Sequence, residues 1–180
     1  EFLSVNDLAD IMIKDIENGA QIIGEIGTSK NVMTNNERKL FEAACIAQKE
    51  TNAVIITHTT LGTYALEQMN FFKERGINLS KVVISHVALA DNFDMILELV
   101  KNGANVAFDT IGKLNYLDDE TRIKFIKQLC QLGYTKQILM SMDLTRQSHL
   151  KKNGGNGGKL EDPWTIFARQ KWQSSPVAGV

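Results

Sequence analysis

The chain has 180 residues, 20 of them basic and 21 acidic, so its formal net charge at pH 7 is −1. This balance, with basic residues dispersed along the chain, gives no support to nucleic-acid binding or to another partner held by a strongly charged surface. With 43% apolar and 23% charged residues, the composition is that of an ordinary folded protein and not of a disordered one.

Neither a membrane span nor an export signal is visible. No apolar run approaches the roughly 18 residues that cross a bilayer, and the start of the chain lacks the basic and apolar segments of a signal peptide. We therefore expect a cytoplasmic protein with no membrane partner. Cys45 and Cys130 form no CxxC pair and fall in segments of helical spacing, which predicts buried free thiols rather than a disulfide or a metal pair.

Short apolar runs alternate with longer amphipathic stretches along most of the chain. Ser4 with Asp7, and Thr34 with Glu37, have the spacing of a capping box at the start of a helix. The pattern predicts five helices at 4–18, 34–47, 61–75, 91–102 and 119–132, and five strands at 20–26, 53–57, 82–85, 104–108 and 137–142.

This alternation predicts an α/β fold with parallel strands, right-handed crossovers and both sheet faces covered. A doubly wound sheet and part of a (β/α)₈ barrel both satisfy it. The barrel is favoured by polar residues at or just after the ends of all five strands, namely Glu25, His58, His86, Asp109 and Asp143. In a barrel these ends converge on one mouth, whereas an open sheet spreads them along a line.

Four of these side chains suit a metal site. His58 and His86 stand where an apolar strand gives way to a loop, and imidazole is a common metal ligand. Glu25 and Asp143 interrupt or follow apolar strands, where a carboxylate is costly to bury unless it is paired or bound to a cation. Together they form a ligand set for Zn²⁺, Mn²⁺ or Fe²⁺.

Structural roles for the same residues stay open. The histidines fit hydrogen bonds to loop backbone, and the two carboxylates fit ion pairs with Lys113 or Arg146. Asp109 fits a cap of its loop as well as it fits a contact with substrate.

Five segments in order resemble the phosphotriesterase-related family of metal-dependent hydrolases, and within it the bacterial phosphotriesterase homology proteins. They are IGEIGTS at 23–29, THT at 57–59, VVISH at 82–86, FDTIGK at 108–113 and SMDLTR at 141–146. The resemblance covers roughly residues 3–157 and implies a (β/α)₈ TIM barrel, of which this chain holds the C-terminal five βα units. We accordingly expect a partial barrel domain at 1–158 and an atypical tail at 159–180.

By this resemblance the barrel mouth holds two divalent metal ions, zinc in the first place and manganese or iron as alternatives. Glu25 stands where the family has its bridging ligand, a carboxylated lysine in the phosphotriesterases proper and a glutamate in the homology proteins. His58 and His86 match the histidines of one metal. Asp143 matches the aspartate that binds the other metal and accepts a proton from the bridging water.

The implied reaction is hydrolysis of a small ester, lactone or phosphoester by a metal-bridging hydroxide. Lys113, Arg146 and His149 lie close enough in sequence to the last strand ends to contact substrate, although surface roles fit them equally well. Thr110 stands where phosphotriesterases proper have a proton-relaying histidine, which argues against organophosphates as the natural substrate.

The chain also departs from the family. It has three histidines and no His-x-His pair for the second metal. We therefore expect a piece of an enzyme, weakly active or inactive alone. The alternative is a non-catalytic half-barrel that docks onto a partner or a second copy, as a homo-oligomer. A barrel of the aldolase type is a third reading, opposed by the lack of a lysine on a strand.

Overall fold

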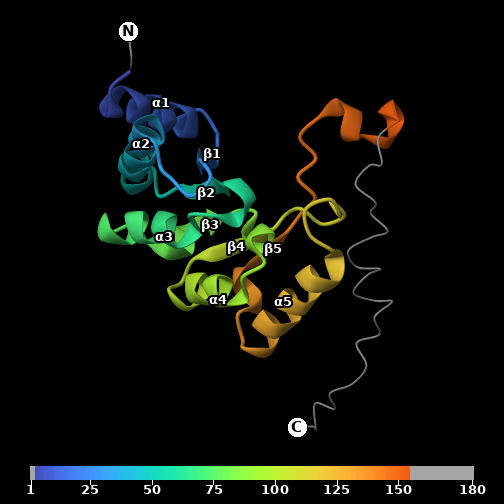
Figure 1. The fold of residues 1–180 in the computed structure, drawn as a ribbon. Coiled ribbons are helices and arrows are strands. Elements are labelled where there is room, and N and C mark those ends of the chain that lie inside the picture. Colours follow the sequence, from blue (N-terminus) through green and yellow to red (C-terminus); the bar gives the residue numbers. More distant parts are fainter. Residues whose placement is uncertain (1–2, 155–180) are drawn as a thin grey trace, which may run out of the picture.

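A computed structural model describes residues 3–154 of the chain (Figure 1). Within this part, strands and helices alternate as expected: α1 Val5–Glu17, β1 Ile22–Thr28, α2 Asn35–Thr51, β2 Val54–Thr59, α3 Ala65–Glu74, β3 Val82–Ile84, α4 Phe93–Lys101, β4 Asn105–Phe108, α5 Asp119–Gln131 and β5 Ile138–Met140. The predicted tail at 159–180, and the domain boundary before it, lie outside the described residues.

Local sequence signals account for most of these boundaries. Ser4 and Thr34 each cap their helix with the full capping box, which satisfies backbone N–H groups that the first turn leaves unpaired.

The predicted helix start at Leu61 is wrong. Leu61 and Tyr64 have φ of 56° and 64°, so a short 3₁₀ turn, η1 (Thr60–Gly62), precedes α3.

The five strands are all parallel and lie in the sheet in the same order as in the sequence. A doubly wound sheet needs a reversal of strand order, and the described sheet has none. Because crossovers between parallel strands are right-handed almost without exception, a sequential strand order places every helix on the same side of the sheet. Figure 1 shows the helices around the outside of a curved array of strands, which is the arrangement of a barrel segment.

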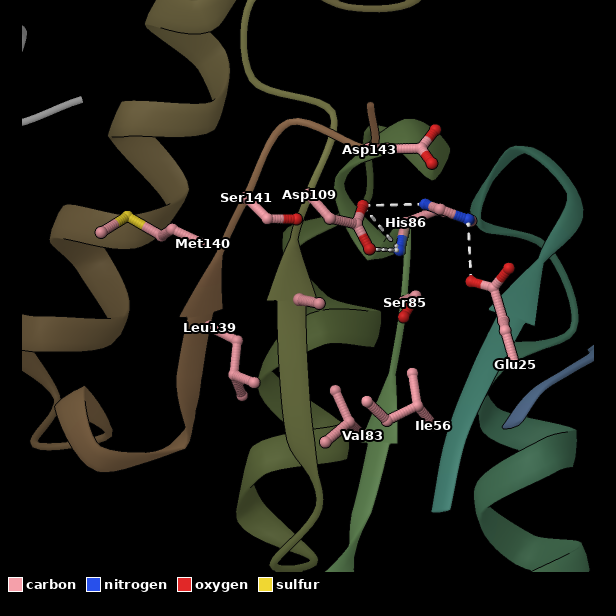
Figure 2. Close-up of a pocket in the computed structure, with 11 residues that line it drawn as sticks. Glu25, Ile56, Val83, Ser85, His86, Asp109, Leu139, Met140, Ser141 and Asp143 are labelled. Atoms are coloured by element: carbon pink, nitrogen blue, oxygen red, sulfur yellow. Dashed lines mark hydrogen bonds and ion pairs between the residues drawn. The ribbon is translucent and has the colours of Figure 1, made fainter. Parts of the chain in front are cut away.

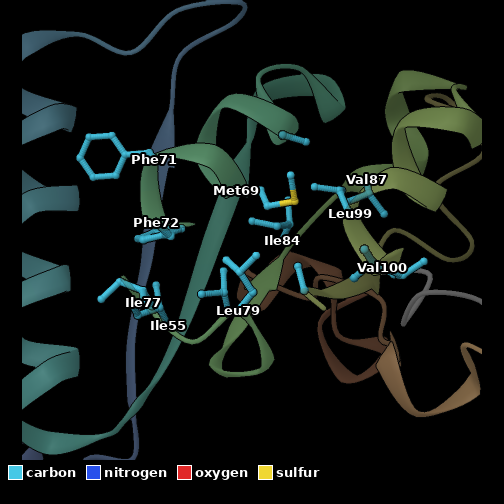
Figure 3. Packing of buried hydrophobic residues seen from close by; sticks show 14 of the residues in the cluster. Ile55, Met69, Phe71, Phe72, Ile77, Leu79, Ile84, Val87, Leu99 and Val100 are labelled. Carbon is cyan, nitrogen blue, oxygen red and sulfur yellow. The ribbon is translucent and has the colours of Figure 1, made fainter. Parts of the chain in front are cut away.

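The apolar core lies between this array and the helices. Ile55 and Ile84 point from the strands into this core and are fully buried (Figure 3). Phe108 belongs to the same core, and Phe41 stacks on Phe72 at a ring-centroid distance of 5.2 Å. Burial alternates along β2, as expected for a strand that packs against helices with one face only.

The expectation that both faces of the sheet are covered is wrong for the described part of the chain, because all helices lie on one side. The edge strands expose apolar side chains instead: Ile22 of β1 is 48% exposed, and Leu139 and Met140 of β5 are 40% and 38% exposed. Two unpaired strand edges and an incompletely covered inner face are what an arc cut from a closed barrel leaves.

Two other expectations concern the thiols and the membrane. Cys45 and Cys130 are free, as predicted, but only Cys45 is buried, whereas Cys130 is partly exposed. Burial raises the pKa of the Cys45 thiol to about 12, which makes it unreactive. Within residues 3–154, none of the helices has the length and apolar character needed to cross a bilayer.

The loops after β2 and β3 pack closely against each other. Gly62, at the end of η1, has φ of 73°, and a Cβ added there would lie 2.4 Å from the backbone nitrogen of Ala90. Ala90 ends a second 3₁₀ turn, η3 (Val87–Ala90), which directly follows His86. Glycine at position 62 therefore permits the contact between the loops that follow His58 and His86.

We predict that Gly62→Ala destabilises the chain more than Gly76→Ala. Gly76 has nearly the same φ, 71°, but open space around its would-be Cβ, so its substitution costs only about 1 kcal/mol of left-handed strain. Gly62→Ala adds a backbone clash worth about 2 kcal/mol more. Urea denaturation of both variants measures the difference, and equal losses would show that the loop contact is not tight.

Candidate metal centre

Three predicted ligands come together near the C-terminal ends of β2 and β3. Glu25 lies in the middle of β1 and not, as the sequence predicts, at its end, because β1 continues to Thr28. Glu25, His58 and His86 each offer one ligand atom, and these atoms lie within 4.8 Å of one another. Glu25 Oε1 is 3.5 Å from His86 Nε2, and Glu25 Oε2 is 3.9 Å from His58 Nδ1. The imidazole rings meet edge to face with centroids 4.7 Å apart. The predicted convergence of these side chains from three separate strands is present in the structure.

The strand pairing explains how Glu25 reaches the histidines. The register between β1 and β2 shifts between Ile23 and Ile26, so Glu25 lies at an irregularity where its side chain remains 46% exposed. Further along, Gly27 pairs with His58, and a Cβ on Gly27 would lie 2.9 Å from His58 Cβ. Glycine at position 27 leaves room for the imidazole.

His58 also contacts polar side chains that no motif in the sequence indicates. Its Nε2 is 3.4 Å from the hydroxyl of Thr60, and its backbone carbonyl accepts a hydrogen bond of 2.8 Å from Gln68 Nε2. Gln68 is fully buried on α3 and also donates to the Thr28 hydroxyl at 2.8 Å. These contacts tie the ends of β1 and β2 together around the imidazole.

Asp109 has a role that the sequence did not indicate. Both of its carboxylate oxygens accept from the backbone N–H of His86 at 3.1 Å, and Oδ1 lies 2.8 Å from His86 Nδ1 (Figure 2). Both side chains are only 9% exposed. A carboxylate at Nδ1 favours the tautomer that carries its proton there, which leaves Nε2, the atom facing Glu25, free to bind a metal. Asp109 therefore orients the imidazole of His86 rather than capping its own loop.

The two histidines have opposite charge preferences. Burial, and then the neighbouring His86, lower the pKa of His58, so its ring is neutral at pH 7. Burial also opposes protonation of His86, but its hydrogen bonds to Asp109 and Glu25 outweigh this and raise its pKa to about 10. The same contact with His86 lowers the pKa of Glu25. A cation that binds these three side chains must displace the proton from His86.

Asp143 lies in the same pocket but outside the group of three ligands. A hollow of about 250 Å³ is bordered by Glu25, His86, Asp109 and Asp143 at its polar end (Figure 2). The Asp143 carboxylate forms an ion pair with the ammonium of Lys113, which is the structural role left open for it above. Its φ of 46° places its backbone in the left-handed region, a strained conformation for aspartate.

The remaining predicted residues differ in how they relate to the pocket. Lys113 reaches it through Asp143, with 22% of its side chain exposed. Arg146 is exposed and is not among the residues that border the hollow. The side chain of His149 lies outside the described part of the structure, so its predicted contact with substrate stays a prediction.

A parallel βα array with candidate imidazole and carboxylate ligands at one rim is an arrangement that metal-dependent barrel hydrolases share. The model of the phosphotriesterase family matches residues 2–160, and the chain belongs to this family. The family resemblance expected from the sequence motifs is thereby confirmed.

Individual relatives agree with this assignment. The chain is 45% identical over 161 residues to the phosphotriesterase homology protein of Escherichia coli, covering 86% of this chain and 55% of the relative. The crystal structure of that protein, complexed with phosphate in its active site, superposes with a TM-score of 0.88 at 42% identity, over 96% of this chain and 62% of the other. A lactonase from Listeria monocytogenes superposes with a TM-score of 0.85 at 30% identity, over 94% and 55%. The chain thus spans little more than half the length of these relatives.

We predict that Asp109→Asn weakens divalent metal binding by about 10- to 100-fold, the usual effect of losing a carboxylate that orients a ligating histidine. The amide can no longer hold the Nδ1 proton as a charged acceptor does. Competition against a chelating dye measures the affinity for Zn²⁺. Asp94→Asn, at an exposed position on α4, is the control and should bind as the unmodified chain does.

The metal-free chain should lose stability as the pH rises from about 6.5 to 10. Because folding raises the pKa of His86 from its ordinary 6.5 to about 10, its protonation stabilises the folded state fully below pH 6.5 and progressively less up to pH 10. Urea denaturation at pH 6, 8 and 10, in the presence of a chelator, measures this slope. His86→Gln should flatten it, and an unchanged slope would refute the assignment.

Proposed function

We propose that this chain supplies the metal-binding part of a hydrolase that cleaves small esters, lactones or phosphoesters. The observation that carries the proposal is the convergence of Glu25, His58 and His86 within 4.8 Å at one rim. The family to which the chain belongs consists of metal-dependent hydrolases, which supports the same reading.

The donor set fits a divalent cation. Two imidazole nitrogens and one carboxylate oxygen are the ligands of many catalytic zinc sites, which keep one further position open for water or substrate. Zinc is our first choice, and manganese or iron fit the same atoms. A bound cation lowers the pKa of water and polarises a carbonyl or phosphoryl oxygen. Asp109 holds the Nδ1 proton of His86 throughout, so that Nε2 stays available as a ligand.

Asp143 is our proposed ligand for a second cation and proton acceptor in the reaction. Its place on the rim of the same hollow supports this role. Within the described residues, Glu25 and Asp143 are the donors left for a second ion, and two carboxylates alone make a weak site. We therefore infer that the second ion takes its other ligands from protein outside this chain.

An ester or lactone is the substrate class we favour. Relatives of this chain include a lactonase, an aryldialkylphosphatase and an N-acetyltaurine hydrolase, so the scissile bond varies within the family. In this chain Thr110 is 2% exposed, and its hydroxyl has no hydrogen-bond partner among the described residues. A buried, unconnected hydroxyl is no substitute for a proton-relaying histidine, which supports esters over organophosphates.

The open edges of β1 and β5 support the further proposal that residues 1–158 are five units of an incomplete barrel domain. Ile22, Leu139 and Met140 are exposed on these edge strands, and additional strands of a closed barrel would cover them. They also favour the second candidate, a non-catalytic half-barrel that docks onto a partner or a second copy. Metal binding separates the two, because only the hydrolase depends on it.

The purified chain should bind one Zn²⁺ or Co²⁺, and His58→Ala should weaken this binding by more than the roughly 100-fold expected for loss of a supporting residue. Elemental analysis and the visible absorption of Co²⁺ report the binding. Glu67→Gln, at an exposed position on α3, is the control and should retain full affinity. A chain that binds no metal, or a His58→Ala variant that binds normally, contradicts the hydrolase proposal. Robust ester hydrolysis by the isolated chain contradicts its incompleteness.

A further inference from the structure

A threonine hydroxyl lies beside one ring nitrogen of His58. Thr60 is the first residue of η1, and its Oγ1 is 3.4 Å from His58 Nε2. The other ring nitrogen, Nδ1, is the atom that lies 3.9 Å from Glu25 Oε2. The imidazole is thus placed between a hydroxyl and a carboxylate, and no step of the proposed reaction uses the hydroxyl.

The proton of this hydroxyl has another acceptor. Thr60 Oγ1 donates to the backbone carbonyl of Thr28 at 2.8 Å, which is a usual length for such a bond and much shorter than the contact with His58. A hydroxyl has one proton and two lone pairs, so Thr60 faces the imidazole as an acceptor. Nε2 of His58 is then the ring atom that carries the proton, and Nδ1 presents a lone pair toward Glu25.

Glu25 by itself would favour the opposite tautomer. A carboxylate beside an imidazole attracts the ring proton to the nearer nitrogen, as Asp109 does at Nδ1 of His86. A protonated Nδ1 of His58 could not bind a cation. The separation of 3.9 Å between Nδ1 and Glu25 exceeds the length of an N–H···O hydrogen bond, in agreement with a lone pair at Nδ1. Thr60 therefore opposes the effect of Glu25.

The hydroxyl of Thr60 is held in place by buried contacts. Gln68 Nε2 donates to the Thr28 hydroxyl and to the His58 carbonyl, both at 2.8 Å, so it fixes the residue that accepts from Thr60. The hydroxyl of Thr63 donates to the Thr60 carbonyl at 2.7 Å. Within the described residues, the buried Oε1 of Gln68 has no hydrogen-bond partner, which costs stability. This cost points to a role for Gln68 in arranging the site.

We propose that Thr60 is a positioning residue: by accepting from Nε2 of His58, it keeps the lone pair of Nδ1 directed at the metal centre. This inference rests on the proposed function, because it gives the tautomer a purpose only if His58 is a metal ligand. Thr60 acts through His58 and takes no part in bond cleavage. His58 and His86 then present opposite ring nitrogens to the centre, with Thr60 and Asp109 at the nitrogens that remain.

The test compares variants of the full 180-residue chain. Thr60→Val removes the hydroxyl and keeps the shape of the side chain, whereas Thr60→Ser keeps a hydroxyl. Thr63→Val is the matched control, because it also removes a hydroxyl of this loop that donates to a backbone carbonyl. Urea denaturation measures the stability of each variant, so that a general loss of folding is recognised.

Two measurements report on the site. Two-dimensional ¹H–¹⁵N NMR of the imidazole rings at pH 8, in the presence of a chelator, shows which nitrogen of His58 carries the proton. His58→Gln identifies its signals among those of the three histidines. Competition against a chelating dye then measures the affinity of each variant for Zn²⁺.

We expect the proton on Nε2 in the unmodified chain and in Thr60→Ser, and a shift of the proton toward Nδ1 in Thr60→Val. The affinity of Thr60→Val for Zn²⁺ should fall by about 10-fold. This is the lower end of the range for loss of a residue that orients a ligating histidine, because a neutral hydroxyl holds a proton less firmly than a carboxylate does. Thr63→Val should keep both the tautomer and the affinity of the unmodified chain.

Two results overturn the inference: the proton of His58 stays on Nε2 in Thr60→Val, or Thr63→Val changes the tautomer as much as Thr60→Val does. Failure of the proposed function gives a different result. A chain that takes up no Zn²⁺, but whose His58 tautomer depends on Thr60, refutes the hydrolase and supports the control of the tautomer. Normal uptake of Zn²⁺ with a tautomer independent of Thr60 leaves the hydrolase standing and refutes the positioning role.

Discussion

Parallel pairing of the strands in chain order is the constraint on which the site depends. This order brings the C-terminal ends of all five strands to one rim. It also places all helices of the described residues on the outer face of the sheet. Glu25, His58 and His86 then need only small local adjustments to meet, namely an irregularity in β1, a glycine beside His58 and a left-handed backbone at His86. A different strand order would separate the same side chains.

Negative charge is concentrated at this rim, and the neighbouring groups respond to it. Asp109 and Glu25 both contact His86, which is why that imidazole retains a proton to a pH far above its ordinary pKa. Asp143 is neutralised by Lys113. The His86 imidazolium and the Lys113 ammonium thus pair with the same carboxylates that divalent cations would bind. The negative charge of these carboxylates favours positive ions at the rim.

The described arc is well packed on its outer side and open elsewhere. Phe41, Phe72 and Phe108 are fully buried between strands and helices, so the individual βα units have a real core. The edge strands have no such cover, and Leu139 and Met140 remain exposed. The helix-facing core is therefore present within the described residues, whereas the two edge strands remain without cover.

The sequence by itself determined most of the elements and three of the candidate ligands. Capping boxes at Ser4 and Thr34 and the apolar runs are local signals. His58 and His86 are recognisable because each follows such a run, and Glu25 because it interrupts one. Only the tertiary structure decided the partners. The bonds from Asp109 to His86 and from Lys113 to Asp143 join residues 23 and 30 positions apart, so no local pattern encodes them. They follow from the folding of separate loops onto one rim, which also decided that Asp109 orients the imidazole of His86.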